Sequence, residues 1–127
     1  MDAGWKYALV FAGGGLGAAL RYWTQGFVYH RTGTGFPYGT LAVNVVGCFV
    51  IGFLMISLEE RFLAAPGLRL FLTVGILGGY TTFSSFSYET LALVRDGEVF
   101  SAFSNVGLSL VSGLAATWAG MVSGRLF

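Results

Sequence analysis

The stretch "GGYTTFSSFSYE" (residues 78–89) decides the fold, because it interrupts a segment that otherwise suits a lipid bilayer. The preceding run, "LFLTVGIL" (residues 70–77), is apolar enough for a lipid-facing helix. A backbone group without a hydrogen-bond partner costs several kcal/mol at membrane depth, so irregular backbone is tolerated there only where protein buries it or water reaches it. We therefore predict a break in this helix near residues 78–82, and we expect the break to serve a function.

The composition places the whole chain in a membrane. Of its 127 residues, 55% are hydrophobic and 10% are charged, whereas soluble domains have about 25% charged residues. A single domain of this length cannot hide that much apolar surface from water. The 20 glycines agree with this conclusion, because membrane helices use glycine freely and pack through small residues. We predict an all-α membrane protein.

Charged residues divide the chain into four apolar stretches. Each stretch reaches or approaches the roughly 20 residues that a helix needs to cross about 30 Å of hydrocarbon. The predicted spans are residues 5–29, 39–59, 68–95 with a central break, and 99–125, which form one domain, residues 1–127. An even number of spans leaves both termini on one side of the membrane.

Several classes of function are excluded by what the sequence lacks. A net charge of +1 without a cluster of lysine and arginine gives no surface for nucleic acid. Cys48 is the only cysteine, so an intrachain disulfide cannot form. Catalysis needs converging acid and base groups, and Glu89 is the only carboxylate near the interior of a span. We therefore expect no enzyme activity.

The basic residues give only a weak signal for orientation. The side that holds both termini carries Lys6, Arg61, Arg69 and Arg125, and the other side carries Arg31 and Arg95. An excess of basic residues in the cytoplasmic loops sets the orientation of membrane proteins. Because the difference here is small, we treat insertion in both orientations, or dual topology, as a hypothesis.

Small residues spaced four apart indicate close contacts between helices. The pairs are Gly13/Gly17, Gly14/Ala18, Gly15/Ala19 and Gly120/Gly124. This spacing fits packing inside one subunit and self-association equally well, so both alternatives stay open.

Three spans carry polar side chains that are costly in lipid. Arg21 in the first span either faces protein or water, or extends its charge to the membrane interface. In the second span, Asn44 follows Thr40 by one turn on the same face, and its amide can donate hydrogen bonds to a ligand or to a neighbouring helix. The fourth span carries one polar stripe, formed by Ser101, Asn105, Ser109 and Ser112. Its serines either line a polar path or bond to carbonyls of their own helix.

The break itself combines groups for a cation and for an anion. Carbonyl oxygens freed at a helix break can coordinate a small cation, and hard cations prefer oxygen ligands. Phe83 and Phe86 are three residues apart and share a helix face, and an aromatic ring has a positive edge. Ser84 and Ser85 lie between them and add hydroxyl donors. An ordinary packed turn is the alternative explanation for this stretch.

Three blocks of the sequence resemble the signature blocks of the Fluc/CrcB fluoride channels, in their small single-domain bacterial form. The blocks are "GGGLGAALRY" (residues 13–22), "GTLAVNVVGCFVIGF" (residues 39–53) and "GILGGYTTFSSFSYE" (residues 75–89). The third block, with its paired phenylalanines, is highly specific, whereas the glycine-rich first block alone would be weak. With the four-span layout, the resemblance covers nearly the whole chain.

This resemblance implies an antiparallel, dual-topology homodimer in the cell inner membrane, with two fluoride pathways. It also implies a sodium ion at the break, held by backbone carbonyls of both subunits that correspond here to Gly78 and Thr81. The pathway residues that the resemblance implies are Phe83, Phe86, Asn44, Ser84, Ser85, Thr40, Ser109 and Ser112, with Arg21 at the vestibule. The assignments on the fourth span rest on its polar pattern.

The expected mechanism is passive conduction of fluoride. Fluoride holds water tightly, so a pathway that dehydrates it must return comparable hydrogen bonds, while a fixed arginine at its centre would bind it too well. The main alternative is a small proton-coupled multidrug exporter of dual topology, and a non-transporting assembly subunit is a further one. The exporter mechanism needs a carboxylate inside the membrane, and here Glu89 would have to serve.

Overall fold

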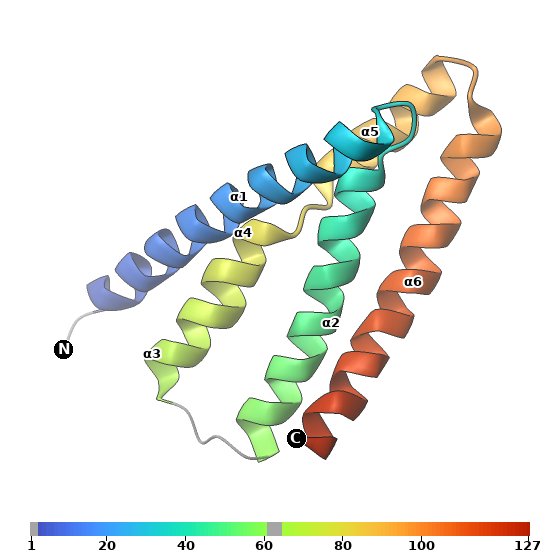
Figure 1. Cartoon of the computed structure of the whole chain (residues 1–127). Coiled ribbons are helices and arrows are strands. Elements are labelled where there is room, and N and C mark those ends of the chain that lie inside the picture. The colour runs from blue at the N-terminus through green and yellow to red at the C-terminus, as the bar shows by residue number, and fades with distance from the viewer. Residues whose placement is uncertain (1–2, 61–64) are drawn as a thin grey trace.

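The computed structural model describes residues 3–60 and 65–127, and every regular element in these ranges is helical (Figure 1). The long helices are α1 (Gly4–Thr32), α2 (Tyr38–Glu60) and α6 (Val99–Leu126). The segment between α2 and α6 is divided into α3 (Pro66–Arg69), the π-helix η1 (Leu70–Leu77), α4 (Gly78–Tyr80) and α5 (Ser84–Arg95), which we call helix three together. The all-α fold is thereby confirmed for the described ranges. Arg61, used above for orientation, lies outside them.

The helix ends carry the residues that their backbone geometry requires. Gly33 and Gly97 follow α1 and α5 with φ angles of 76° and 82°, a left-handed conformation that glycine adopts without strain. Pro66 begins α3, where its missing N–H costs nothing because the first N–H groups of a helix have no intrahelical partner.

α2 and α6 lie side by side and run in the same direction (Figure 1). Glycines of α6 let the two backbones approach each other closely. A Cβ atom added at Gly120 would overlap the Phe49 carbonyl, and one at Gly124 would lie 2.9 Å from the Phe53 carbonyl oxygen. The small pair Gly120/Gly124 therefore packs inside the subunit.

α1 crosses helix three obliquely, and glycines make this contact close as well (Figure 1). A Cβ atom added at Gly13 would lie 2.8 Å from Gly75 Cα, and one at Gly17 would overlap the Ile76 carbonyl. This pair of small residues on α1 also serves packing inside the subunit. Gly15 differs, because it is exposed and an added Cβ would have nothing within 4 Å.

Substituting Gly17 by alanine is expected to destabilise the subunit, because the new methyl group overlaps backbone that cannot rotate away. Overpacking of this kind costs about 1–3 kcal/mol. Gly15→Ala is the matched control, and it should leave stability unchanged or raise it by up to about 1 kcal/mol, the helix preference of alanine over glycine. Thermal unfolding of both purified variants in detergent measures the difference, and equal melting temperatures would contradict the close contact.

The interruption of helix three lies at residues 81–83, so the predicted range of 78–82 is wrong at its N-terminal end. Gly78 and Gly79 are still helical. Gly79 serves close packing instead, because an added Cβ would overlap the Gly14 carbonyl of α1. The backbone leaves the helix at Thr81, which is extended with φ −90° and ψ 159°. Gly79 thus lets α1 approach closely, whereas an added Cβ at Gly78 would have nothing within 4 Å, and the break itself lies at the threonines that follow.

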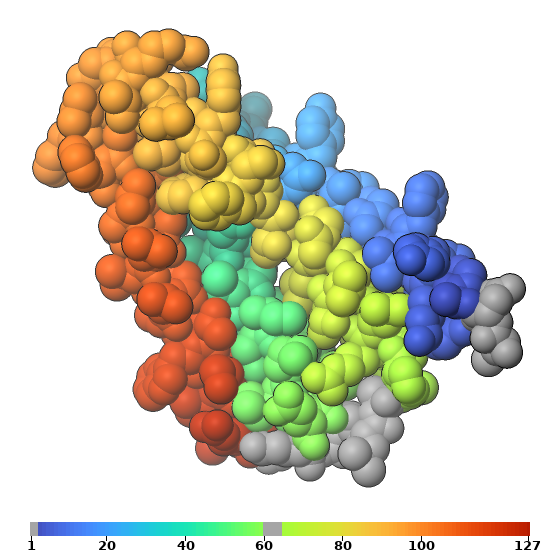
Figure 2. Space-filling view, turned by 180° about the vertical axis from the view of Figure 1, so that it is seen from behind, coloured from blue at the N-terminus to red at the C-terminus, as the bar shows by residue number. Residues whose placement is uncertain are grey.

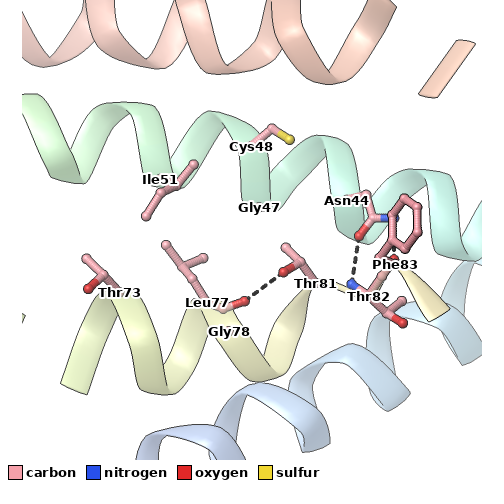
Figure 3. A pocket seen from close by; sticks show the side chains of 10 residues that line it. All are labelled: Asn44, Gly47, Cys48, Ile51, Thr73, Leu77, Gly78, Thr81, Thr82 and Phe83. Carbon is pink, nitrogen blue, oxygen red and sulfur yellow. Dashed lines mark hydrogen bonds between the residues drawn. The ribbon is translucent and has the colours of Figure 1, made fainter. Parts of the chain in front are cut away.

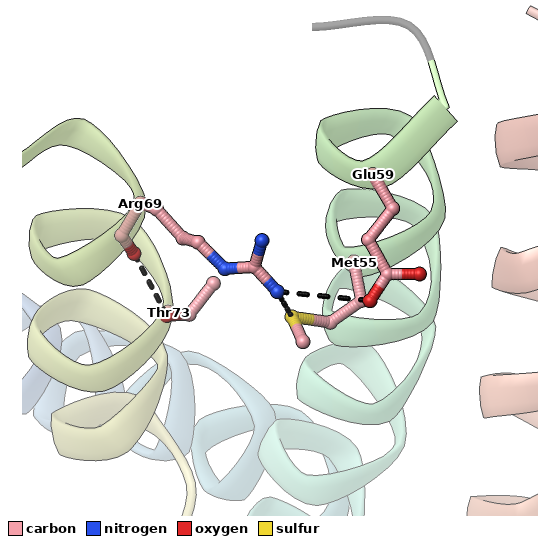
Figure 4. Close-up of polar contacts among 4 residues, drawn as sticks. All are labelled: Met55, Glu59, Arg69 and Thr73. Atoms are coloured by element: carbon pink, nitrogen blue, oxygen red, sulfur yellow. Dashed lines mark hydrogen bonds and ion pairs between the residues drawn. The ribbon is translucent and has the colours of Figure 1, made fainter. Parts of the chain in front are cut away.

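A polar contact joins the start of helix three to the end of α2 (Figure 4). Arg69 Nη2 lies 3.7 Å from Glu59 Oε1 and 3.9 Å from Met55 Sδ. The Thr73 hydroxyl donates to the Arg69 carbonyl at 2.7 Å. Both charged side chains are about half exposed, and exposed ion pairs contribute about 0–1 kcal/mol. This contact therefore orients the two segments more than it stabilises them.

Among the described residues, two helical stretches are long and apolar enough to cross a membrane, Tyr38–Glu59 and Val99–Leu126. α1 has the length of a span, but it contains Arg21, Gln25 and His30. Helix three is divided into pieces, each shorter than a span. The observed helix bounds differ by a few residues from the four predicted spans.

Candidate functional site at the interruption of helix three

A hollow of about 370 Å³ lies between α2 and helix three, beside the interruption (Figure 3). It opens onto the surface where α2 and the first half of helix three, green and yellow-green, lie next to each other in the view from behind (Figure 2). Its lining is mostly apolar and includes one amide and several hydroxyls. The lining residues are Asn44, Gly47, Cys48 and Ile51 on α2, and Thr73, Leu77, Gly78, Thr81, Thr82 and Phe83 on helix three. The hollow thus contains four of the predicted site residues: Asn44, Gly78, Thr81 and Phe83.

Asn44 holds the interruption open by two hydrogen bonds to one residue (Figure 3). Its Nδ2 donates to the Thr82 carbonyl at 2.9 Å, and its Oδ1 accepts from the Thr82 N–H at 2.9 Å. In a continuous α-helix that N–H would bond to the Gly78 carbonyl. The Asn44 amide therefore replaces the helical partners of Thr82, and it deprives the Gly78 oxygen of its helical donor.

Arg21 performs a similar replacement from the other side. In a continuous helix the Gly79 carbonyl would accept from the Phe83 N–H, but here Arg21 Nε donates to it at 3.1 Å. The Arg21 side chain is partly buried, so of the two alternatives it faces protein. A cation is favourable at this position because the C-terminal end of a helix carries a partial negative charge. Arg21 is absent from the lining of the hollow, and its place at a vestibule stays a prediction.

Thr82 restarts the helix after the interruption. Its Oγ1 accepts a hydrogen bond from the Ser85 N–H at 3.2 Å, and the first helical bond of the new segment runs from the Ser87 N–H to the Phe83 carbonyl at 2.9 Å. The N-cap position is Phe83, and the Thr82 hydroxyl, one residue before it, supplies a partner to one of the N–H groups that a helix start leaves without a helical acceptor. The remaining N–H groups at the start of a helix have no intrahelical partners and favour anions. The start of α5, at Phe83 and Ser84, is thus an electropositive backbone end beside the hollow.

The rings of Phe83 and Phe86 touch, with centroids 5.6 Å apart and planes tilted by 50°. Phe83 lines the hollow and is 77% exposed, whereas Phe86 is partly buried and lies outside the lining. The two rings are therefore neighbours, although Phe83 precedes α5 and is not itself helical, and their role in a pathway stays a prediction. Within one chain, Phe83 thus lies on the surface.

The other predicted pathway hydroxyls are not part of the lining of this hollow. Thr40 is 2% exposed, and its Oγ1 accepts from Gln25 Nε2 at 3.2 Å, which joins α1 to α2. On α6, Ser112 bonds back to the Leu108 carbonyl, and Ser109 is partly buried. Ser84 is exposed and Ser85 is partly buried at the start of α5. The role of these residues in a pathway stays a prediction.

Oxygen atoms of the backbone are the available metal ligands at the interruption. In the part of the chain that the structure describes, no three His, Cys, Asp or Glu side chains gather to hold a metal ion. Gly78 is exposed and its carbonyl has lost its helical donor to Asn44, while Thr81 has left the helix. These two carbonyls fit a hard monovalent cation by donor type. One chain supplies too few of them to surround an ion.

Two hydrogen bonds of this site were not predicted from the sequence. The bond from the Ser85 N–H to the Thr82 hydroxyl has a local signal, because a threonine stands three residues before Ser85 at a helix start. The bond from Arg21 to Gly79 spans 58 residues along the chain, and nothing in the local pattern of either residue indicates it.

In the described ranges all regular elements are helices, two of them are long and apolar enough to cross a membrane, and helix three is interrupted where side chains replace helical hydrogen bonds, which together indicate an integral membrane protein. The family described as "CrcB-like protein, Camphor Resistance (CrcB)" matches residues 8–121. The chain belongs to this family.

Relatives over nearly the whole length carry the name "Fluoride-specific ion channel FluC". The protein from Acidobacterium capsulatum is 46% identical over 120 residues, which cover 94% of this chain and 96% of the relative. The protein from Geobacter sulfurreducens is 51% identical over 112 residues (88% and 90%), and that from Methylocella silvestris is 47% identical over 118 residues (91% and 90%). These relatives are named as ion channels, and the chain accordingly belongs to a family of channels and not of enzymes.

Proposed function

We propose that this chain forms a passive, fluoride-selective channel that lets fluoride leave the cell through the inner membrane. The observation that carries the proposal is the interruption at residues 81–83, where Asn44 and Phe83 line one hollow and α5 begins directly after Phe83. The printed names of the relatives support fluoride as the ion.

The chemistry of these groups suits a small, strongly hydrated anion. Fluoride gives up water only where hydrogen-bond donors replace it in steps, and it leaves only where no single site binds it too tightly. Ring edges, hydroxyls and the electropositive start of a helix attract an anion without a full positive charge. The charge of Arg21 is directed to the Gly79 carbonyl and lies outside the lining of the hollow. This arrangement favours conduction of fluoride rather than its tight binding.

A second copy of the chain is needed to enclose the pathway. Phe83 is 77% exposed beside a hollow that opens onto the surface, and an exposed ring at that place gives a fluoride ion protein on one side only. We infer an antiparallel homodimer in which the partner covers this face, with one pathway on each side. The small difference in basic residues between the two ends supports insertion in both orientations.

The same dimer would complete a sodium site. Gly78 and Thr81 line the open hollow, and a twofold-related partner would double the number of carbonyl oxygens that these residues offer. Backbone carbonyls at a broken helix bind sodium in other membrane proteins. The ion would be structural and would hold the two interruptions together.

Replacing sodium by N-methylglucamine throughout extraction and purification is therefore expected to lower the melting temperature and the dimer fraction. The bulky organic cation cannot be surrounded by carbonyls that fit a small ion. Differential scanning fluorimetry and size-exclusion chromatography in detergent measure both quantities, and adding sodium back should restore them. Identical melting curves in every monovalent cation would contradict the site.

Ion flux from reconstituted liposomes tests the function itself. Liposomes loaded with fluoride and containing the purified protein should release fluoride at a rate proportional to the amount of protein. Matched liposomes loaded with chloride should release it far more slowly, because chloride is larger and a poorer hydrogen-bond acceptor. Equal release of both anions, or no release of fluoride, would contradict the proposal.

One feature of the structure is compatible with the alternative function, a multidrug exporter. Glu89 lies one turn after Phe86 on α5, its Oε1 is buried, and no described residue donates a hydrogen bond to that atom. Tyr29 donates to Oε2 at 3.5 Å. An exporter needs such a carboxylate to exchange protons for a drug. Drug-dependent proton movement in the same liposomes, without fluoride release, would favour the exporter. The relatives are named as fluoride channels, which favours the channel.

A further inference from the structure

α5 carries the residues of the proposed pathway, yet little apolar packing holds it. Leu93 is its only buried residue among the twelve from Ser84 to Arg95. Phe86 is partly buried, and Ser84 is exposed. An element with so few buried apolar contacts is free to shift, so its angle must be set by other contacts.

One such contact comes from the interior of α6. Asn105 is 1% exposed, which makes it one of the most buried side chains among the described residues. Its Nδ2 donates to Thr90 Oγ1 at 2.9 Å, and that hydroxyl in turn donates to the Phe86 carbonyl at 2.7 Å. The Thr90 hydroxyl has one hydrogen, so this chain of bonds has a fixed direction, from α6 to the backbone of Phe86.

Hydrogen bonds fix the relative position of two helices more narrowly than apolar contacts do, because they require a particular distance and angle. A shift of α5 along α6 would break the bond from Asn105 and leave a buried amide without its partner, which is costly. The bond therefore holds the turn that contains Phe86 at one register relative to α6.

We propose that Asn105 is a positioning residue for fluoride conduction: through Thr90 it fixes the orientation of α5 and of the Phe86 ring, without touching the ion. This inference rests on the proposed channel function. It assigns to Asn105 a role that differs from that of the polar stripe as a whole, since Ser112 bonds only to its own helix.

A double-mutant cycle tests the assignment. Asn105→Leu removes the donor, and Thr90→Val removes the relaying hydroxyl at nearly the same volume. Each variant should lower the fluoride release rate per folded dimer by up to about tenfold, as expected for the loss of one hydrogen bond. Because both changes break the same chain, the double variant should be no slower than the slower single variant.

Two variants serve as controls. Thr90→Ser keeps the hydroxyl and should retain the wild-type rate. Thr117→Val removes a hydroxyl that bonds back to the Gly113 carbonyl at 3.1 Å in the same way, on α6, and it should leave the rate unchanged. Rates are measured in liposomes with counted dimers, together with the fluoride-to-chloride ratio and the melting temperature in detergent.

A positioning role predicts that Asn105→Leu and Thr90→Val reduce the fluoride-to-chloride ratio as well as the rate at an equal folded fraction. Additive effects in the cycle, or lower melting temperatures with an unchanged rate and ratio per folded dimer, would overturn the assignment while leaving the channel function in place. A folded wild-type dimer that releases no fluoride would overturn the proposed function, and this assignment with it. The wild-type measurement thus separates the two failures.

Discussion

Asn44→Leu is expected to abolish most of the fluoride conduction while leaving the four helical segments in place. Leucine has the same branched shape as asparagine, with four side-chain heavy atoms, and it is the larger of the two, so the change removes the amide and leaves no empty space. The N–H and the carbonyl of Thr82 then lose their partners at 2.9 Å. Each unsatisfied group costs about 1–3 kcal/mol, which gives about 2–6 kcal/mol against the open interruption.

The interruption can escape this cost by closing into a continuous helix, in which the Thr82 N–H bonds to the Gly78 carbonyl. That change would rotate Phe83 away from its present position at the hollow, and it would occupy the carbonyl proposed for sodium. A penalty of this size makes the open conformation rarer by about 30-fold or more. Fluoride release from liposomes per folded dimer should fall by at least the same factor.

Thr82→Ser is the matched control for this experiment. It keeps the backbone that Asn44 binds and the hydroxyl that accepts from the Ser85 N–H, so the release rate should stay near that of the wild type. Circular dichroism and melting temperature establish that the variants are folded. A folded Asn44→Leu variant with an unchanged rate would show that the amide has no part in conduction or in holding the interruption.

Whether a feature of this site could be predicted depends on how far apart in the sequence the residues that form it are. The long helices follow from apolar runs bounded by charges, a local property of the sequence. The break was predicted near residues 78–82, which include the two glycines, and the N-terminal end of this range was wrong. A glycine in a membrane helix allows either unwinding or close packing, and the local pattern is the same for both. Gly79 packs against the Gly14 carbonyl of α1, which only the tertiary structure reveals.

The polar side chains divide in the same way. Asn44 and Arg21 stand out in the sequence because they are costly in lipid, so their importance could be predicted. Their partners could not, since the bond from Asn44 to Thr82 spans 38 residues and that from Arg21 to Gly79 spans 58. A single sequence does not reveal which residues of two packed helices lie opposite each other. The π-helical hydrogen bonding of η1 likewise leaves no local signal in "LFLTVGIL".

Phe83→Ile is expected to slow fluoride release sharply without unfolding the subunit. Phe83 is 77% exposed within one chain, so its replacement removes little apolar burial from the subunit and should change the melting temperature of the monomeric fold only slightly. Isoleucine is apolar and of comparable bulk, but it lacks the positive ring edge that attracts an anion. Loss of such an edge contact, at about 0.5–1.5 kcal/mol, lowers the rate by up to about tenfold.

Phe86→Ile distinguishes the effect of a single ring edge from the effect of the contact between the two rings. Phe86 is partly buried and its ring touches that of Phe83 at 5.6 Å between centroids, so this change removes one edge and also the neighbour that orients the other. We therefore expect it to slow release at least as much as Phe83→Ile, with a larger fall in melting temperature. Phe100→Ile is the matched control, because Phe100 is 86% exposed at the start of α6 and outside the lining of the hollow. If Phe83→Ile and Phe86→Ile both form folded dimers that release fluoride as fast as Phe100→Ile, the rings do not contact the ion, and the donors of the pathway must be the hydroxyls, the Asn44 amide and the backbone.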